Sequence, residues 1–143
     1  MTNPLTRQVA GSHYVKLGMQ PVVFATANLY DPCAFSILKY ITRWRDKNGL
    51  QDLQKALHFA ELRQAVNVDR YLINHPWNKV FTGPISIHTY TRVNNLPKTE
   101  CDILLWLDRW VYSDRGGRHG LGMKDASENV VRLLQQLITE NGG

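Results

Sequence analysis

Residues 37–56 have the sequence ILKYITRWRDKNGLQDLQKA, and this stretch decides the fold. On both sides of Asn48-Gly49, apolar residues recur at the three- and four-residue spacing of an amphipathic helix. Glycine adopts the left-handed backbone conformation that commonly ends a helix, so Asn48-Gly49 predicts a stop followed by an immediate restart. Two helices joined by so short a turn form an antiparallel helical hairpin.

The rest of the chain predicts a mainly α protein built on this hairpin. With 143 residues, of which 43% are hydrophobic, the chain is long enough for a single domain, residues 1–143, with a buried core. Start and stop signals indicate helices over residues 21–29, 31–47, 50–71, from about 99 to beyond 111, and 125–141.

Residues 85–93 (ISIHTYTRV) are the exception to this helical pattern. They alternate and are rich in β-branched side chains, which is typical of a short β-strand. The sequence offers no clear pairing partner, and a lone strand leaves its backbone groups unpaired. The segment therefore either pairs with another copy of the protein or is helical or irregular.

Charge and cysteine content narrow the functional classes. The formal net charge of +5 favours anionic partners such as nucleotides, nucleic acid or a membrane surface, without choosing among them. Cys33 and Cys101 form no close pair, which is typical of buried thiols in a reducing compartment, and the histidines lack metal-site spacing, so no metal site is expected. Without a signal pattern or a membrane-spanning apolar run, we expect a cytoplasmic protein.

A stripe of basic residues follows from the hairpin. Lys39, Arg43 and Lys47 are spaced by four, so they share one face of the predicted helix, with Tyr40 beside them. An arginine can hold a phosphate through two hydrogen bonds, while lysines add point charge. The stripe is therefore a candidate seat for a phosphate-bearing ligand, and the ordinary alternative is a solvated helix face.

Two shorter motifs precede and follow this stripe. Asp52 and Lys55 open the next helix, where Asp52 could hold Mg²⁺ or a ribose hydroxyl and Lys55 a phosphate. The ordinary explanation of Asp52 is an acid that stabilises the helix dipole. His13 and Tyr14 could offer an imidazole and a stacking ring to a ligand, or could belong to an arm that packs on the hairpin.

A second candidate phosphate loop lies at residues 115–124 (RGGRHGLGMK). Its glycines would let backbone amides approach a phosphate, and Arg115, Arg118, His119 and Lys124 would supply positive charge. The loop is not a Walker sequence, because Gly-Lys-Ser/Thr is absent. A flexible surface loop is the ordinary alternative.

Taken in order, these motifs resemble a small phage-encoded family, the phage nucleotide kinase-like family. Its pattern is His-Tyr, then Lys-Tyr-x-x-Arg, then a Lys, then Asp-Leu-x-Lys-Ala, and the resemblance extends over roughly residues 11–64. The domain is largely of unknown function, but one phage member is described as a nucleoside monophosphate kinase without a Walker motif. The resemblance implies an all-α nucleotide-handling part at residues 11–72, followed by a C-terminal extension at 74–143. It implies a site at His13, Tyr14, Lys39, Arg43, Lys47, Asp52 and Lys55.

We therefore expect a phage or prophage protein, present in the cytoplasm of an infected bacterial cell, that binds a phosphorylated nucleotide. If it is an enzyme, it is a nucleoside monophosphate kinase that needs Mg²⁺, with catalytic residues that the sequence does not identify. The alternative is a non-catalytic sponge that sequesters a nucleotide immune signal, linear or cyclic. Nucleic-acid binding is a weaker alternative, because no reading motif is present. The apolar helix around Trp106 and Trp110 also predicts a homo-oligomer.

Overall fold

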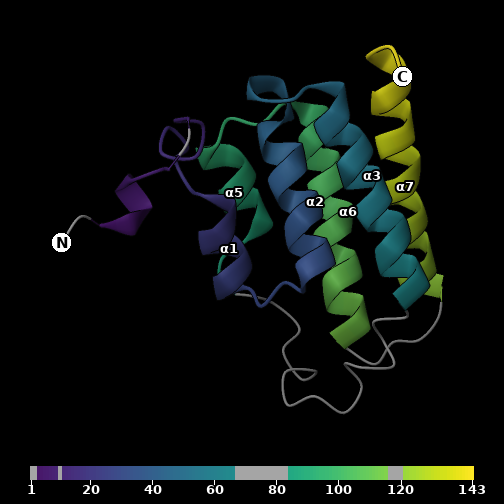
Figure 1. The fold of residues 1–143 in the computed structure, drawn as a ribbon. Helices are drawn as coiled ribbons and strands as arrows, with labels where there is room; N and C mark the ends of the chain where they lie inside the picture. Colours follow the sequence, from purple (N-terminus) through teal and green to yellow (C-terminus); the bar gives the residue numbers. More distant parts are fainter. Residues whose placement is uncertain (1–2, 10, 67–83, 116–120) are drawn as a thin grey trace.

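The structure, a computed structural model, describes residues 3–9, 11–66, 84–115 and 121–143, with the side chains of 113–115 and 121–123 left aside. Helices dominate these residues, and no strand occurs among them, which confirms the mainly α fold class (Figure 1). The elements are η1 (Pro4–Thr6), α1 (Pro21–Ala27), α2 (Pro32–Arg43), η2 (Trp44–Asp46), α3 (Leu50–Val66), α5 (Ile87–Val93), α6 (Lys98–Arg115) and α7 (Leu121–Glu140).

The predicted hairpin is formed by α2 and α3. Asp31 caps α2 as expected, because its Oδ1 accepts the backbone N–H of Ala34 at 2.9 Å, and Pro32 occupies the first helical position. Gly49 forms the turn with a φ of +56° and donates its N–H to the carbonyl of Trp44 at 2.8 Å.

One boundary of the hairpin differs from the prediction. The α-helix α2 ends at Arg43 rather than near Lys47, because the tighter 3₁₀ turn η2 follows it. Lys47 adopts a non-helical backbone after that turn, so Lys39 and Arg43 share a helix face while Lys47 leaves it. The predicted end of α3 near residue 71 lies outside the described residues.

Four long helices form the body of the molecule. The hairpin α2–α3 packs against α6 and α7, and the two short helices α1 and α5 lie to one side (Figure 1). The helices α6 and α7 therefore complete the core on which the hairpin rests. Apolar side chains from all four helices are fully buried together: Ile37, Leu38, Leu53, Ile103, Leu104, Leu107 and Leu134.

The strand suggested for residues 85–93 is wrong, since Ile87–Val93 form the helix α5. Ser86 caps this helix by accepting the N–H of His88 at 3.2 Å. Ile87, Tyr90 and Thr91 are buried and follow the three- and four-residue spacing of a helix. A short run of alternating residues also contains positions at this spacing, so the sequence pattern alone fits both structures. Burial of that face against the rest of the chain decides between the two periods.

The apolar face of α6 is covered within the chain. Trp110 is buried, and the helix contacts α2, α5 and α7. The side chain of Trp106 is half-buried, with the Arg109 guanidinium 5.1 Å from its ring centre. These contacts cover the buried face of α6, and the predicted homo-oligomer stays a prediction. None of the described helices is long and apolar enough to cross a membrane.

The middle of the predicted phosphate loop at 115–124 lies outside the described residues. Arg118 and His119 lie outside the described residues, as does the side chain of Arg115. The helix α7 begins at Leu121, four residues before the predicted start at Asp125. Lys124 is exposed on its first turns, with Nζ 3.9 Å from the Glu128 carboxylate one turn later.

Candidate functional site

Arg43, in the last turn of α2, is the centre of the candidate site. Its Nε donates to Asp52 Oδ2 at 3.1 Å, its Nη2 to Asp52 Oδ1 at 3.4 Å, and its Nη1 to the Tyr14 hydroxyl at 2.9 Å. The short turn makes the contact between Arg43 and Asp52 possible, because it brings the end of α2 beside the first turn of α3. The two hydrogen bonds that we expected Arg43 to offer a phosphate are made to Asp52 instead.

The Asp52 carboxylate is wholly enclosed. Its side chain has no exposed surface, and Oδ1 also accepts from Asn48 Nδ2 at 3.4 Å. A buried carboxylate bonded to Arg43 on both oxygens does not fit a magnesium ligand or a ribose contact, because neither oxygen faces solvent. No cluster of three or more metal-ligating side chains occurs in the part of the chain that the structure describes.

Three cations surround the ring of Tyr40. Lys39 Nζ lies 4.6 Å from the ring centre, Arg43 Cζ 4.8 Å and Lys55 Nζ 5.7 Å. Among the described residues, only Arg43 of these three has a carboxylate partner. The ring is held in turn by Phe59, which stacks on it at 6.0 Å. Cation–π attraction thus keeps two lysines without carboxylate partners among the described residues close to the Tyr40 ring.

The N-terminal arm places an imidazole of defined tautomer beside this cluster. The backbone N–H of Tyr14 donates to Gln8 Oε1 at 2.8 Å, so the Gln8 amide nitrogen is the atom that faces His13 Nδ1, at 3.1 Å. Nδ1 must then accept, and the ring proton resides on Nε2. Gly11 permits this contact with a φ of +74°, since a Cβ there would lie 3.3 Å from His13 Nδ1.

The Nε2–H of His13 is therefore a hydrogen-bond donor, and it has no partner among the described residues although it is shielded from solvent. Burial lowers the pKa of His13, and the positive charges of Lys47 and Arg43 lower it further, against the opposing carboxylates of Asp52 and Asp46. The imidazole is thus held neutral with a donor to offer, which suits an anionic oxygen.

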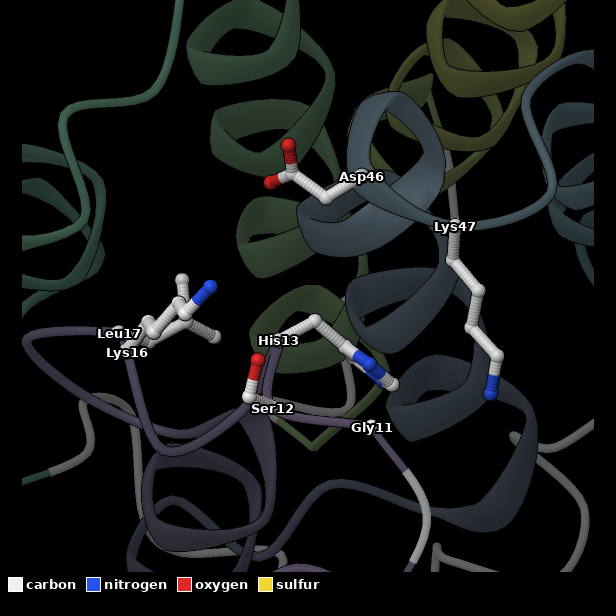
Figure 2. Close-up of a pocket in the computed structure, with 7 residues that line it drawn as sticks. All are labelled: Gly11, Ser12, His13, Lys16, Leu17, Asp46 and Lys47. Atoms are coloured by element: carbon white, nitrogen blue, oxygen red, sulfur yellow. The ribbon is translucent and has the colours of Figure 1, made fainter.

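His13 also lines a cavity of about 740 Å³ between the arm and the end of η2 (Figure 2). A turn closed by the Lys16 N–H on the Ser12 carbonyl, at 3.3 Å, forms the arm side. Asp46 and Lys47 form the other side, with the Lys47 side chain extending past the His13 ring in Figure 2. The full lining is Gly11, Ser12, His13, Lys16, Leu17, Asp46 and Lys47.

Tyr14 connects this cavity to the cluster on α2. Its ring centre lies 4.1 Å from that of His13, and its hydroxyl accepts from Arg43. Burial raises the pKa of the Tyr14 phenol, against the opposing effect of Arg43, so the hydroxyl stays protonated at neutral pH. Tyr14 therefore links the His13 ring at the cavity with the Arg43–Asp52 pair at the hairpin turn.

The structure gathers the eight side chains that the sequence singled out near the hairpin. His13, Tyr14, Lys39, Tyr40, Arg43, Lys47, Asp52 and Lys55 are connected by the hydrogen bonds, ring contacts and charge interactions described above. Sequence reasoning missed Gln8, Lys16 and Asp46. Gln8 and Lys16 lie in an arm without helical or strand periodicity, so no pattern pointed to them. The position of Asp46 beside Lys47 was a signal that could have been used.

A family model described as a protein of unknown function (DUF3310) matches residues 6–61, less than half of the chain. The matched segment runs from the end of η1 through most of α3, so it includes the arm, the hairpin turn and all eight of these side chains. No curated protein and no solved structure matches the chain.

Proposed function

We propose that this protein binds a phosphorylated nucleotide, with the phosphate in the cavity between the arm and η2. One observation carries the proposal: this cavity is lined by two lysines, Lys16 and Lys47, that form no salt bridge among the described residues, and by His13 with its unpaired N–H. A phosphate oxygen accepts hydrogen bonds from such donors and neutralises such charges. The cavity volume of 740 Å³ lies within the range of about 300–1,000 Å³ usual for small-molecule sites.

The Arg43–Asp52 pair supports the site without holding the ligand. It fixes Tyr14 through the Arg43 hydrogen bond, and Tyr14 in turn holds Gln8 and the neighbouring His13 ring. Lys39 and Lys55 add positive charge nearby on the Tyr40 face. The field of these groups would attract an anionic ligand to the arm.

Within this proposal we favour binding over phosphoryl transfer. Transfer to a nucleoside monophosphate calls for groups that position a nucleophile and neutralise charge, usually with Mg²⁺. The two acids nearest the site do not lie in one catalytic arrangement. The Asp52 side chain is buried against Arg43, and Asp46 is exposed and lines the cavity. A protein that sequesters a nucleotide needs cations and hydrogen-bond donors but no catalytic acid, and Lys16, Lys47 and His13 supply these beside Asp46.

A calorimetric titration with one matched pair of variants tests the proposal. Nucleoside mono-, di- and triphosphates and cyclic nucleotides are compared with the unphosphorylated nucleosides. We expect only phosphorylated compounds to bind, and Lys47→Gln to weaken the best of them about tenfold, or about 1.4 kcal/mol. Arg132→Gln is the control, because it removes one exposed cation on α7 whose partner there is Asn129. Equal affinity in both variants would contradict a phosphate site at Lys47.

A product assay on the same proteins separates binding from catalysis. After incubation with ATP, Mg²⁺ and each monophosphate, the protein is denatured and the nucleotides are resolved by chromatography. Recovery of unchanged nucleotides supports sequestration. A diphosphate product, formed by the wild type and lost in Lys47→Gln, would instead establish a kinase.

A further inference from the structure

An apolar cleft separates α1 from α2 on the other side of Tyr14. It consists of two adjoining hollows of about 90 and 260 Å³ that share Val22 and Phe35. We call these hollows together the α1–α2 cleft. The smaller is completed by Tyr14, Gln20, Pro21 and Lys39, and the larger by Ala25, Thr26, Tyr30 and Pro32.

The cleft lies next to the candidate phosphate site through the contact between Tyr14 and His13. Tyr14 lines the smaller hollow, while its ring neighbour His13, with ring centres 4.1 Å apart, lines the polar cavity. Lys39 also lines the smaller hollow, with Nζ 5.6 Å from the Phe35 ring centre and 4.6 Å from that of Tyr40. A single ligand lying across Tyr14 would therefore meet an apolar surface at one end and cations at the other.

The volumes of the two hollows, about 90 and 260 Å³, limit the kind of occupant. The two hollows are too small for the side of a helix, but they are of the size of a flat ring system.

We propose that the α1–α2 cleft holds the aromatic base of the nucleotide whose phosphate occupies the polar cavity. This inference rests on the proposed function and adds the second half of the ligand. Val22 and Phe35 supply the apolar contact for the faces of the base, and the Lys39 amine is a polar group at its edge, while the Gln20 amide nitrogen donates to the Leu5 carbonyl.

Val22 is the residue that allows a clean test. Its side chain is 46% exposed, so Val22→Asp places a charge in the cleft without disturbing the core. Leu62→Asp is the matched control, because Leu62 is 38% exposed on α3 and lines neither the cleft nor the cavity. Val22→Ala serves as a milder variant that removes contact without adding charge.

The experiment is calorimetry on the full chain with the four nucleoside 5′-monophosphates and with ribose 5-phosphate, which lacks the base. We expect the wild type and Leu62→Asp to bind at least one monophosphate tenfold or more tightly than ribose 5-phosphate. Val22→Asp should abolish that difference and Val22→Ala should reduce it about threefold. Both variants should leave the affinity for ribose 5-phosphate unchanged.

The outcomes distinguish this inference from the proposed function. If ribose 5-phosphate binds as tightly as every monophosphate, or if Val22→Asp retains the preference, the base does not occupy the cleft, while the phosphate site stands. If no phosphorylated compound binds to the wild type, both proposals are overturned.

Discussion

The two ends of the α2–α3 hairpin contain the same kind of ion pair in different surroundings. At the turn, Arg43 of α2 meets Asp52 of α3, and at the open end Asp31 before α2 meets Arg63 of α3 at 2.9 Å. In both pairs the acid lies at a helix N-terminus and the arginine in a last turn. Each charge thus complements the dipole of its own helix, and the antiparallel arrangement brings opposite charges together.

What covers each pair gives it a different role. Arg63 has no exposed side-chain surface, and its guanidinium lies 4.4 Å from the Trp110 ring centre on α6, inside the bundle. Arg43 lies instead beside the N-terminal arm, through Tyr14, and over the Tyr40 ring, near which Lys39 and Lys55 have no acid partners among the described residues. The Asp31–Arg63 pair therefore joins helices of the core, and the Arg43–Asp52 pair supports the surface that we propose receives a ligand.

The largest effect is expected at the open end. Asp31→Ala should lower the free energy of unfolding by about 3–5 kcal/mol, because it leaves the buried Arg63 without the Asp31 carboxylate. Urea denaturation monitored by circular dichroism measures the change. Nucleotide affinity, measured below the unfolding transition, should stay the same, since this pair lies outside the proposed site.

Asp31→Asn serves as the control, because asparagine also caps helices but has no charge. Burial acts to raise the pKa of Asp31, but Arg63 and the Ala34 N–H outweigh it and hold the pKa below its ordinary value. Stability from this group is thus present above the unfolded-state pKa of about 4 and lost as the pH falls through the lower folded-state pKa. Acid titration should show that loss in the wild type but not in Asp31→Asn.

A smaller loss of stability, with a loss of binding, is expected at the turn. Arg43→Met should cost about 2–3 kcal/mol, because Asp52 remains buried but keeps its Asn48 hydrogen bond. It should also abolish nucleotide binding, since Tyr14 and the arm lose their anchor. Urea denaturation and calorimetry on the same preparation separate the two effects. A variant destabilised in this way that still binds normally would show that the arm holds its position without Arg43.

These two pairs also show how much the sequence could predict. The cap at Asp31, the stop at Gly49 and the convergence of Arg43 with Asp52 follow from local rules and a short turn, so they were predictable. The role of Arg43 was not predictable, because residue spacing shows which side chains share a helix face but not which partners accept their hydrogen bonds. The Asp31–Arg63 pair was also missed, since it depends on how the open ends of the two hairpin helices align, which residue spacing along each helix does not give.

The smallest predicted effect is on the acidity of His13, and it tests whether the cavity acts as one electrostatic unit. In the wild type the pKa of His13 should lie below its ordinary value of about 6.5, because burial and the charges of Lys47 and Arg43 disfavour the imidazolium. Lys47→Gln removes one of these cations, so it should raise the pKa of His13. Binding of a phosphate should also raise it, because an adjacent anion stabilises the protonated ring.

The measurement is a titration of the His13 ring resonances by NMR, with Arg132→Gln as the control for removal of a distant charge. The ring nitrogen shifts in the same spectra test the tautomer, since a proton on Nε2 is required by the Gln8 contact. A rise in Lys47→Gln but not in Arg132→Gln would locate the positive field at the cavity. If Lys47→Gln leaves the pKa of His13 unchanged, Lys47 does not act on the imidazole, and the cavity does not act as one electrostatic unit.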